Sequence, residues 1–140
     1  MERTIFYIDN DEDDLEFFQS VASEINQKVY TFTSYDVMVA ALREHGLKPS
    51  IIFVDLNMPV KNGYEVIRDI KASGGLRDIP LIIFSTANSS VLIKKYWQLG
   101  ASLYIVKPNS VAALRDTIRN VLAIDWQRFY ISPQNILYSA

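Results

Sequence analysis

Four residues that can take part in chemistry each stand directly after a short apolar run. Asp9 follows TIFYI, Asp55 follows IIFV, Ser85 follows LIIF and Lys107 follows LYIV. A carboxylate can act as a nucleophile and form an acyl phosphate. An ammonium group can neutralise the charge on phosphoryl oxygens, and a small hydroxyl can hydrogen-bond the transferred group. Together these residue types indicate transfer of a phosphoryl group to a carboxylate.

The acidic stretch that begins at Asp9 is also suited to a metal ion. Asp9 is followed by Asn10 and Asp11. Neighbouring carboxylate and carbonyl oxygens are ligands that Mg²⁺ prefers in proteins. The ion would add positive charge near the phosphoryl oxygens. The sequence therefore predicts Mg²⁺ beside this stretch.

The elements that must position these residues follow a β-α repeat of five units. Strands are predicted at 4–8, 28–32, 51–54, 81–84 and 103–106, and helices at 13–26, 34–45, 62–72, 89–99 and 110–124. The runs 51–54 and 81–84 are apolar throughout, which is typical of parallel strands covered on both faces. Ligands of a doubly wound sheet bind at the carboxyl ends of the strands. The four reactive residues should therefore meet at one edge.

Composition excludes several other classes of protein. The chain has 140 residues, a net charge of −2, no Cys and a single His. A length of this size fits one domain, and the weak negative charge argues against a general nucleic-acid binder. The absence of Cys and the single His exclude thiolate sites and His-cluster metal sites. The N-terminus does not resemble a signal peptide and no apolar run is long enough to span a membrane, so we expect a cytoplasmic protein.

Four motifs in this order resemble the receiver domain of two-component response regulators. They are IDND (8–11), FVDLNMPVKNG (53–63), IIFSTA (82–87) and YIVKP (104–108), each at a predicted strand end. The resemblance covers residues 3 to about 124. It implies a flavodoxin-like α/β fold, with a doubly wound sheet of five parallel strands in the order 2-1-3-4-5 and five helices. We expect a receiver domain over residues 1–124 and a C-terminal extension over 125–140.

The resemblance assigns roles to residues of the phosphoryl site. Asp55 matches the phosphoacceptor of the family, and Lys107 matches its lysine at the end of the fifth strand. Ser85 and Tyr104 match the two switch residues. The peptide bond between Lys107 and Pro108 is commonly cis in the family.

The resemblance also implies the metal ligands. Asp9, Asn10, Asp55 and the backbone carbonyl of Asn57 match the residues that hold Mg²⁺ in the family. A carboxylate usually stands at the position of Asn10. An amide offers an oxygen without negative charge, so we expect weaker metal binding and slower phosphotransfer. Asp11 follows at once and would compensate in part.

The resemblance implies signalling through proteins rather than turnover of an external substrate. The phosphodonor would be a sensor histidine kinase or a phosphotransfer protein, and the output a downstream protein partner. The 16 residues of the extension are too few for a DNA-binding domain. Receivers with short extensions sometimes form homodimers. We therefore expect a single-domain response regulator, not an enzyme.

Three alternatives use this fold or a related α/β architecture. A degenerate receiver would act only as a binding module, and Asn10 favours it. An aspartyl-phosphate phosphatase would need a second aspartate two residues after the nucleophile, where Asn57 stands. A flavin-binding module would need a hydroxyl-rich loop after the first strand, where IDNDEDD stands.

Some polar and apolar residues have plain structural interpretations. We interpret Asp13 and Asp14 as acids that stabilise the first turn of a helix. Leu92, Trp97 and Tyr104 lie near the face that family members use for partners, and they either form an exposed docking site or pack inward. Trp126 and Phe129 of the extension either fold back onto the fifth helix or contribute to a dimer.

Overall fold

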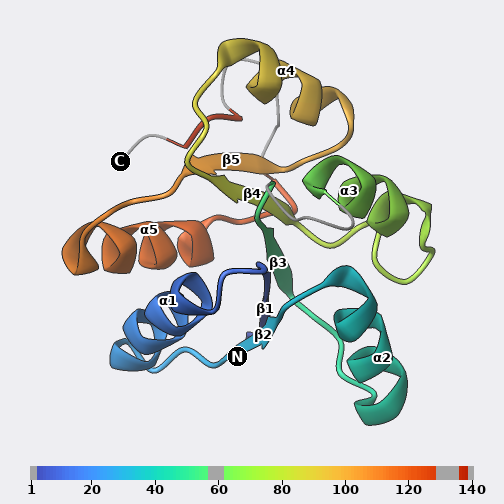
Figure 1. Cartoon of the computed structure of the whole chain (residues 1–140), viewed down its shortest axis with the longest axis horizontal. Helices are drawn as coiled ribbons and strands as arrows, with labels where there is room; N and C mark the ends of the chain where they lie inside the picture. The colour runs from blue at the N-terminus through green and yellow to red at the C-terminus, as the bar shows by residue number, and fades with distance from the viewer. Residues whose placement is uncertain (1–2, 57–61, 129–135, 139–140) are drawn as a thin grey trace.

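The computed structural model describes residues 3–56, 62–128 and 136–138. Strands and helices alternate through these ranges (Figure 1). The strands are β1 (Ile5–Ile8), β2 (Val29–Phe32), β3 (Ile51–Val54), β4 (Leu81–Ser85) and β5 (Leu103–Val106). The helices are α1 (Glu12–Glu24), α2 (Tyr35–His45), α3 (Gly63–Ala72), α4 (Ser90–Gln98) and α5 (Val111–Ala123). Each lies within a few residues of its predicted position.

The strands form one parallel sheet in the order β2-β1-β3-β4-β5, which confirms the predicted topology. Ile8 at the end of β1 pairs with Phe32 on one side and with Val54 on the other. At the other end of the sheet, Ser85 pairs with Val106. Because the register aligns the strand ends, the residues that follow them lie along one edge.

Helices cover both faces of the sheet, as the wholly apolar strands predict. The buried side chains of α1 and α5 pack with Ile5 and Tyr7 of β1 on one face. Those of α2, α3 and α4 pack with Phe6 and Ile8 on the other face. This separation is visible in Figure 1, where α1 and α5 lie together on one side. Alternate residues of a strand point to opposite faces, so a strand with both faces covered must be apolar throughout.

Side-chain caps set where the helices begin. The side chain of Asp11 accepts hydrogen bonds from the N–H groups of Asp13 and Asp14, so α1 begins directly after the acidic loop. The side chain of Ser34 caps α2 by accepting a hydrogen bond from the N–H group of Val37. Gly46 ends α2 with φ 63°, a left-handed conformation that glycine adopts without strain.

Gly63 holds the start of α3 against the end of β3. Its N–H group donates to the carbonyl oxygen of Leu56 at 3.0 Å. A Cβ atom at this position would lie 2.7 Å from the Cα of Leu56 and 3.1 Å from the carbonyl oxygen of Asp55. Both contacts are with backbone, so a larger residue would displace the loop that carries Asp55.

A segment beyond α5 lies along the outer side of β5. Residues 136–138 run parallel to this strand, with Leu137 opposite Tyr104 in an isolated bridge (Figure 1). Nearer to α5, Trp126 is partly buried and packs against the side chains of the α1 and α5 face. Phe129 lies outside the described residues.

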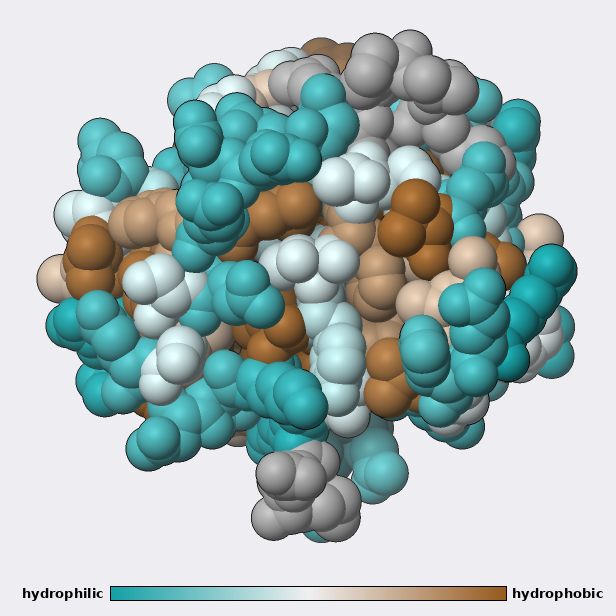
Figure 2. Space-filling view, turned by 60° about the horizontal axis from the view of Figure 1, so that its bottom comes forward, coloured by the Kyte–Doolittle hydropathy of each residue, from teal (hydrophilic) through white to brown (hydrophobic). Residues whose placement is uncertain are grey.

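The surface separates polar from apolar side chains. On the face drawn in Figure 2, hydrophilic side chains project outward, and hydrophobic atoms lie mostly in the recesses between them. In the part of the chain that the structure describes, every helix is too short or too polar to span a bilayer.

Candidate functional site

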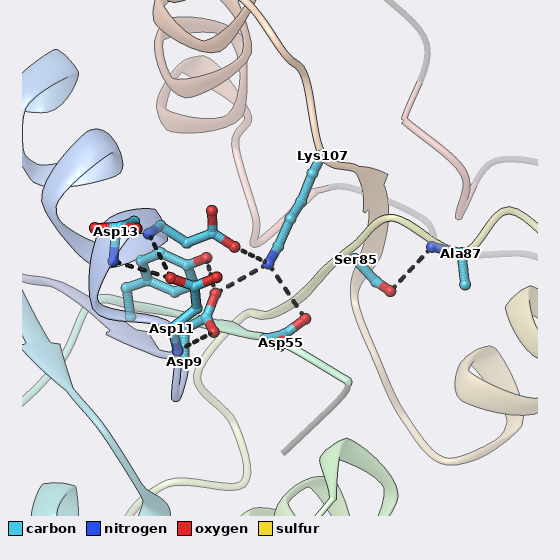
Figure 3. A network of polar contacts seen from close by, with 9 residues as sticks. Asp9, Asp11, Asp13, Asp55, Ser85, Ala87 and Lys107 are labelled. Atoms are coloured by element: carbon cyan, nitrogen blue, oxygen red, sulfur yellow. Dashed lines mark hydrogen bonds and ion pairs between the residues drawn. The ribbon is translucent and has the colours of Figure 1, made fainter. Parts of the chain in front are cut away.

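The ammonium group of Lys107 joins three carboxylates at the carboxyl ends of the strands (Figure 3). Its Nζ atom lies 2.8 Å from Oδ2 of Asp14 and 3.0 Å from Oδ2 of Asp9. It lies 3.4 Å from Oδ1 of Asp55. These residues come from α1, the end of β1, the end of β3 and the end of β5. The predicted convergence of Asp9, Asp55 and Lys107 therefore exists in the structure.

Asp9 is a fully buried carboxylate whose two oxygens both accept hydrogen bonds. The Tyr7 hydroxyl donates to Oδ2, and the N–H group of Asp11 donates to Oδ1 at 3.0 Å. The side chain is 0% exposed. A buried charge is costly unless it is paired and hydrogen-bonded, and these donors together with Lys107 meet that requirement.

Tyr7 stays protonated as a donor to Asp9. Burial raises the pKa of Tyr7 far above its usual value, and the charge of Asp9 and the hydrogen bond to it raise this pKa further. The phenol therefore keeps its proton and donates a hydrogen bond to the carboxylate throughout the physiological range.

Lys107 remains a cation in spite of its burial. Burial by itself lowers the pKa of Lys107, but the hydrogen bonds to Asp14 and Asp9 and the charges of Asp9 and Asp55 outweigh it and raise the pKa above its usual value. The ring of Phe84 lies 5.8 Å from Nζ and adds a cation–π contact. The group can therefore neutralise negative charge at any physiological pH.

Asp55 is the strand-end carboxylate that solvent can reach. Its side chain is 8% exposed, whereas that of Asp9 is 0% exposed. Its N–H group donates to the carbonyl oxygen of Ile8 at 3.0 Å, which continues the β1–β3 pairing and fixes the backbone. A nucleophile needs both a fixed position and access to its substrate, and of these two carboxylates Asp55 alone has both.

Ser85 and Tyr104 are linked to each other through Ala87, and Ser85 is linked to Lys107 through the backbone. The buried Ser85 Oγ accepts a hydrogen bond from the N–H group of Ala87 at 3.2 Å (Figure 3). The Tyr104 hydroxyl donates to the carbonyl oxygen of Ala87 at 2.6 Å. The N–H group of Lys107 donates to the carbonyl oxygen of Ser85 at 2.8 Å. The two expected switch residues therefore share one partner.

Tyr104 packs inward rather than forming an exposed docking residue. Its side chain is buried in the cluster between the sheet and α4. Burial raises the pKa of Tyr104, so its hydroxyl remains a donor to Ala87. Leu92 and Trp97 are partly buried against the same cluster. Tyr104 therefore packs inward and does not belong to an exposed docking site.

The oxygens of Asp9 and Asp55 fit a divalent cation. Both carboxylates contact one ammonium group, so their oxygens already converge on a positive charge. Carboxylate oxygens are the donor type that Mg²⁺ prefers. Asn10 is exposed beside them. The fourth expected ligand, Asn57, lies outside the described residues, and within these residues no group of three or more acids or histidines forms a metal site by itself.

Two residues of the site were not identified from the sequence. Tyr7 looks like an ordinary core residue of β1, although a tyrosine two positions before a strand-end acid points to the same side as that acid. Asp14 is an acid of the first turn of α1, as expected, but it also forms the shortest of the three Lys107 contacts, which the sequence did not indicate.

The peptide bond between Lys107 and Pro108 is trans, in contrast to the expected cis form. A trans bond is the commoner form before proline.

The sequence matches the response regulator receiver domain over residues 5–119. The chain belongs to this family. The match confirms the resemblance found in the four motifs. As a receiver domain, the chain is a module of two-component signalling, and receiver domains are signalling modules rather than typical enzymes.

Plant response regulators are among the relatives of this receiver domain. The two-component response regulator ARR6 of Arabidopsis thaliana is 31% identical over 93 residues, which cover 64% of this chain and 50% of ARR6. ORR5 of Oryza sativa subsp. japonica is 33% identical over 90 residues, covering 63% of this chain and 67% of ORR5. This chain spans about half the length of ARR6, ARR16 and FilR2 of Methanothrix harundinacea.

Solved structures of response regulators share the fold. The phosphorylated cyanobacterial phytochrome response regulator RcpA has a TM-score of 0.75 at 25% identity, covering 86% of this chain and 91% of RcpA. The Mn(2+)-bound form of Rcp1 has a TM-score of 0.73 at 20% identity, covering 93% of this chain and 99% of Rcp1. The likeness to Rcp1 shows the fold alone.

Proposed function

We propose that Asp55 accepts a phosphoryl group and that this receiver acts as a single-domain response regulator. The observation that carries the proposal is the position of Lys107, whose ammonium group touches Asp55 and Asp9 at the ends of β3 and β1. The proposed receiver domain spans residues 1–124, and residues 125–140 form a C-terminal extension. The donor is a sensor histidine kinase or a phosphotransfer protein, and we expect the two to meet in the cytoplasm.

The proposed step is a direct displacement at phosphorus. An oxygen of the Asp55 carboxylate attacks, the P–N bond of the donor phosphohistidine breaks, and the imidazole nitrogen keeps the electron pair and takes up a proton. The product is an acyl phosphate on Asp55. Lys107 lies 3.4 Å from Oδ1 of Asp55, so its charge stands where the phosphoryl oxygens gain negative charge.

Asp9, Asn10, Asp55 and Asn57 are the proposed Mg²⁺ ligands. The bound ion would neutralise negative charge on the phosphoryl oxygens. Asp9 is held in place by Tyr7 and by the N–H group of Asp11, so its orientation is already fixed. Because Asn10 carries no charge, we expect the ion to bind more weakly than it would with a carboxylate at this position.

Ser85 is the proposed sensor of the phosphoryl group. Its hydroxyl now accepts from Ala87 and can turn to donate to a phosphoryl oxygen. Ala87 in turn holds the Tyr104 hydroxyl, so a movement of this loop reaches the face formed by α4, β5 and α5. The output is binding or release of a downstream protein partner, with no turnover of an external substrate. Self-association into a homodimer is a further proposed output, which sedimentation tests.

The experiment is incubation of the full chain with acetyl phosphate, with and without Mg²⁺, followed by intact mass. We expect a Mg²⁺-dependent gain of one phosphoryl group, because acetate leaves as the Asp55 oxygen attacks. The Asp55→Asn variant removes the nucleophile at nearly unchanged volume and should gain nothing. An equal gain by this variant would contradict the assignment of Asp55.

The second candidate function is that of a receiver that binds partners without phosphorylation. Asn10 favours it, since one charge of the metal site is missing. The same mass experiment on Asn10→Asp separates the two functions if the wild-type chain gains nothing. A gain by this variant assigns the failure to weak metal binding, whereas no gain in either protein supports the binding module.

A further inference from the structure

The outer edge of β5 is occupied by residues of the same chain. The N–H group of Tyr104 donates to the carbonyl oxygen of Ile136 at 2.8 Å, and the N–H group of Tyr138 donates to the carbonyl oxygen of Tyr104 at 2.8 Å. Leu137 lies between them as the parallel partner of Tyr104. Residues 136–138, here named the edge segment, are therefore paired with β5 through one parallel bridge.

Side chains of the edge segment pack into the apolar clusters on both faces of the sheet. Ile136 is 0% exposed and belongs to the apolar cluster that contains Tyr96 of α4. The hydroxyl of Tyr138 accepts a hydrogen bond from Nδ2 of Asn120 in α5 at 2.9 Å. The Leu137 side chain between them remains 44% exposed. The contact surface thus accepts a buried apolar side chain and, two positions later, an aromatic one.

The edge segment is held by few interactions. One fully buried side chain, two backbone hydrogen bonds to Tyr104, and the packing of Tyr138 with its hydrogen bond from Asn120 stabilise it. The conformational entropy lost on ordering its three residues opposes binding and is of similar size. The segment can therefore leave β5 while the five-stranded sheet stays folded. Its departure exposes the unpaired N–H and C=O groups of an edge strand, which another extended chain can bind.

We propose that β5, α4 and α5 form a strand-binding groove whose resident ligand is the edge segment. A partner protein binds there by displacing the segment and pairing its own extended strand with Tyr104. The partner strand carries an apolar residue in the position of Ile136 and an aromatic residue in that of Tyr138. This inference rests on the contacts of the edge segment and does not require phosphorylation of Asp55.

Amide hydrogen exchange of the full chain, read by NMR, tests whether the edge segment can leave. The Tyr104 amide donates to Ile136, whereas the amides of Ser102 and Lys107 donate across to β4, at Leu81 and Ser85. In an Ile136→Asp variant we expect exchange at Tyr104 to accelerate by about tenfold or more, because a carboxylate cannot enter the apolar cluster. Exchange at Ser102 and Lys107 should stay unchanged.

Two further variants control this experiment. Leu137→Asp places the same charge on the exposed side chain of the segment and should leave exchange at Tyr104 unchanged. Tyr138→Phe removes only the hydrogen bond from Asn120, and we expect exchange at Tyr104 to accelerate by about threefold. The second variant keeps the test valid if Ile136→Asp does not fold.

A synthetic peptide of residues 133–140, PQNILYSA, tests whether the groove accepts a strand from outside. Added to the Ile136→Asp chain, it should restore protection of the Tyr104 amide. The same peptide with Asp in place of Ile136 should not. The wild-type chain should bind the first peptide more weakly than the Ile136→Asp chain does, because the peptide must displace the edge segment.

Three results would overturn the proposal. The first is acceleration at Ser102 and Lys107 equal to that at Tyr104 in Tyr138→Phe, which would mean that the segment leaves only when the sheet unfolds. The second is failure of the wild-type peptide to protect Tyr104 in the folded Ile136→Asp chain. The third is a loss of Tyr104 protection on dilution of the wild-type chain, which would assign the strand to a second copy.

Discussion

The carboxyl-terminal edge of the sheet and the outer edge of β5 lie close together but are held by different forces. At the first edge, Lys107 touches three acids that come from α1, β1 and β3. At the second, Ile136 and two backbone hydrogen bonds attach a segment to one strand. A charge network anchored on several elements fixes geometry for chemistry, whereas a short apolar attachment can be exchanged for another. Tyr104 belongs to both edges.

Removing the ammonium group of Lys107 should have the largest effect on the chemistry of the first edge. In Lys107→Met, which keeps a similar length without the ammonium group, we expect phosphorylation of the chain by acetyl phosphate to slow by about 100-fold. The measurement is the rate of phosphoryl gain by intact mass. Lys48→Met, at an exposed position outside the site, is the matched control and should react normally. A Lys107→Met rate close to that of the control would show that the lysine is not part of the reaction.

At the second edge, the stability of the chain should depend on the buried side chain of Ile136. We expect Ile136→Ala to lower the free energy of unfolding by about 2 kcal/mol, because the lost side chain is fully buried. Leu137→Ala, in the same segment but 44% exposed, should change it by less than about 0.5 kcal/mol. Urea denaturation measures both. Equal losses in the two variants would mean that the segment is not anchored through Ile136.

The stabilisation that Tyr7 supplies to the polar network of the first edge should depend on pH, unlike that of the apolar second edge. Tyr7→Phe should lower the free energy of unfolding by about 1.5 kcal/mol at pH 8, because the hydroxyl donates to a charged carboxylate. The pKa of Tyr7 is raised in the folded chain, so its stabilisation is present below the usual tyrosine value near 10 and is lost as pH rises above it. The difference between variant and wild type should therefore shrink above about pH 10. A constant difference in urea denaturation at pH 8 and pH 10.5 would contradict this role.

The smallest expected effect concerns the charge missing from the first edge. Asn10→Asp should lower the dissociation constant for Mg²⁺ by about fivefold, since a full negative charge near the ion adds Coulomb attraction. Isothermal titration with Mg²⁺ measures the constant. Asn26→Asp makes the same chemical change at the far end of α1 and should leave it unaltered. Equal dissociation constants for wild type and Asn10→Asp would show that the Asn10 amide does not weaken Mg²⁺ binding.

The first edge was largely predictable because it depends on strand ends. Asp9, Asp55, Ser85 and Lys107 each follow an apolar run, and parallel strands bring their carboxyl ends together whatever the details of packing. The topology follows from the same pattern and from the resemblance carried by the four motifs. These inferences need only the order of the elements.

The remaining contacts depend on orientation, which the sequence pattern does not specify. Asp14 contacts Lys107 from the first turn of α1, which depends on how α1 packs. Alternation along β1 places Tyr7 and Asp9 on one face, but it does not show that the hydroxyl donates to the carboxylate. The edge segment is too short to show a strand period, so nothing in its sequence indicates pairing with Tyr104. Charged helix ends and short terminal segments are thus where packing decides the outcome.

The most direct measurement of the central claim is the position of the phosphoryl group. The chain is treated with acetyl phosphate and Mg²⁺ and then with borohydride, which reduces an acyl phosphate to an alcohol, and the peptides are sequenced by mass spectrometry. We predict that position 55 becomes homoserine while Asp9 and Asp14 stay intact. Homoserine at Asp9 or Asp14 in place of position 55 would contradict the assignment of Asp55 as the phosphoacceptor.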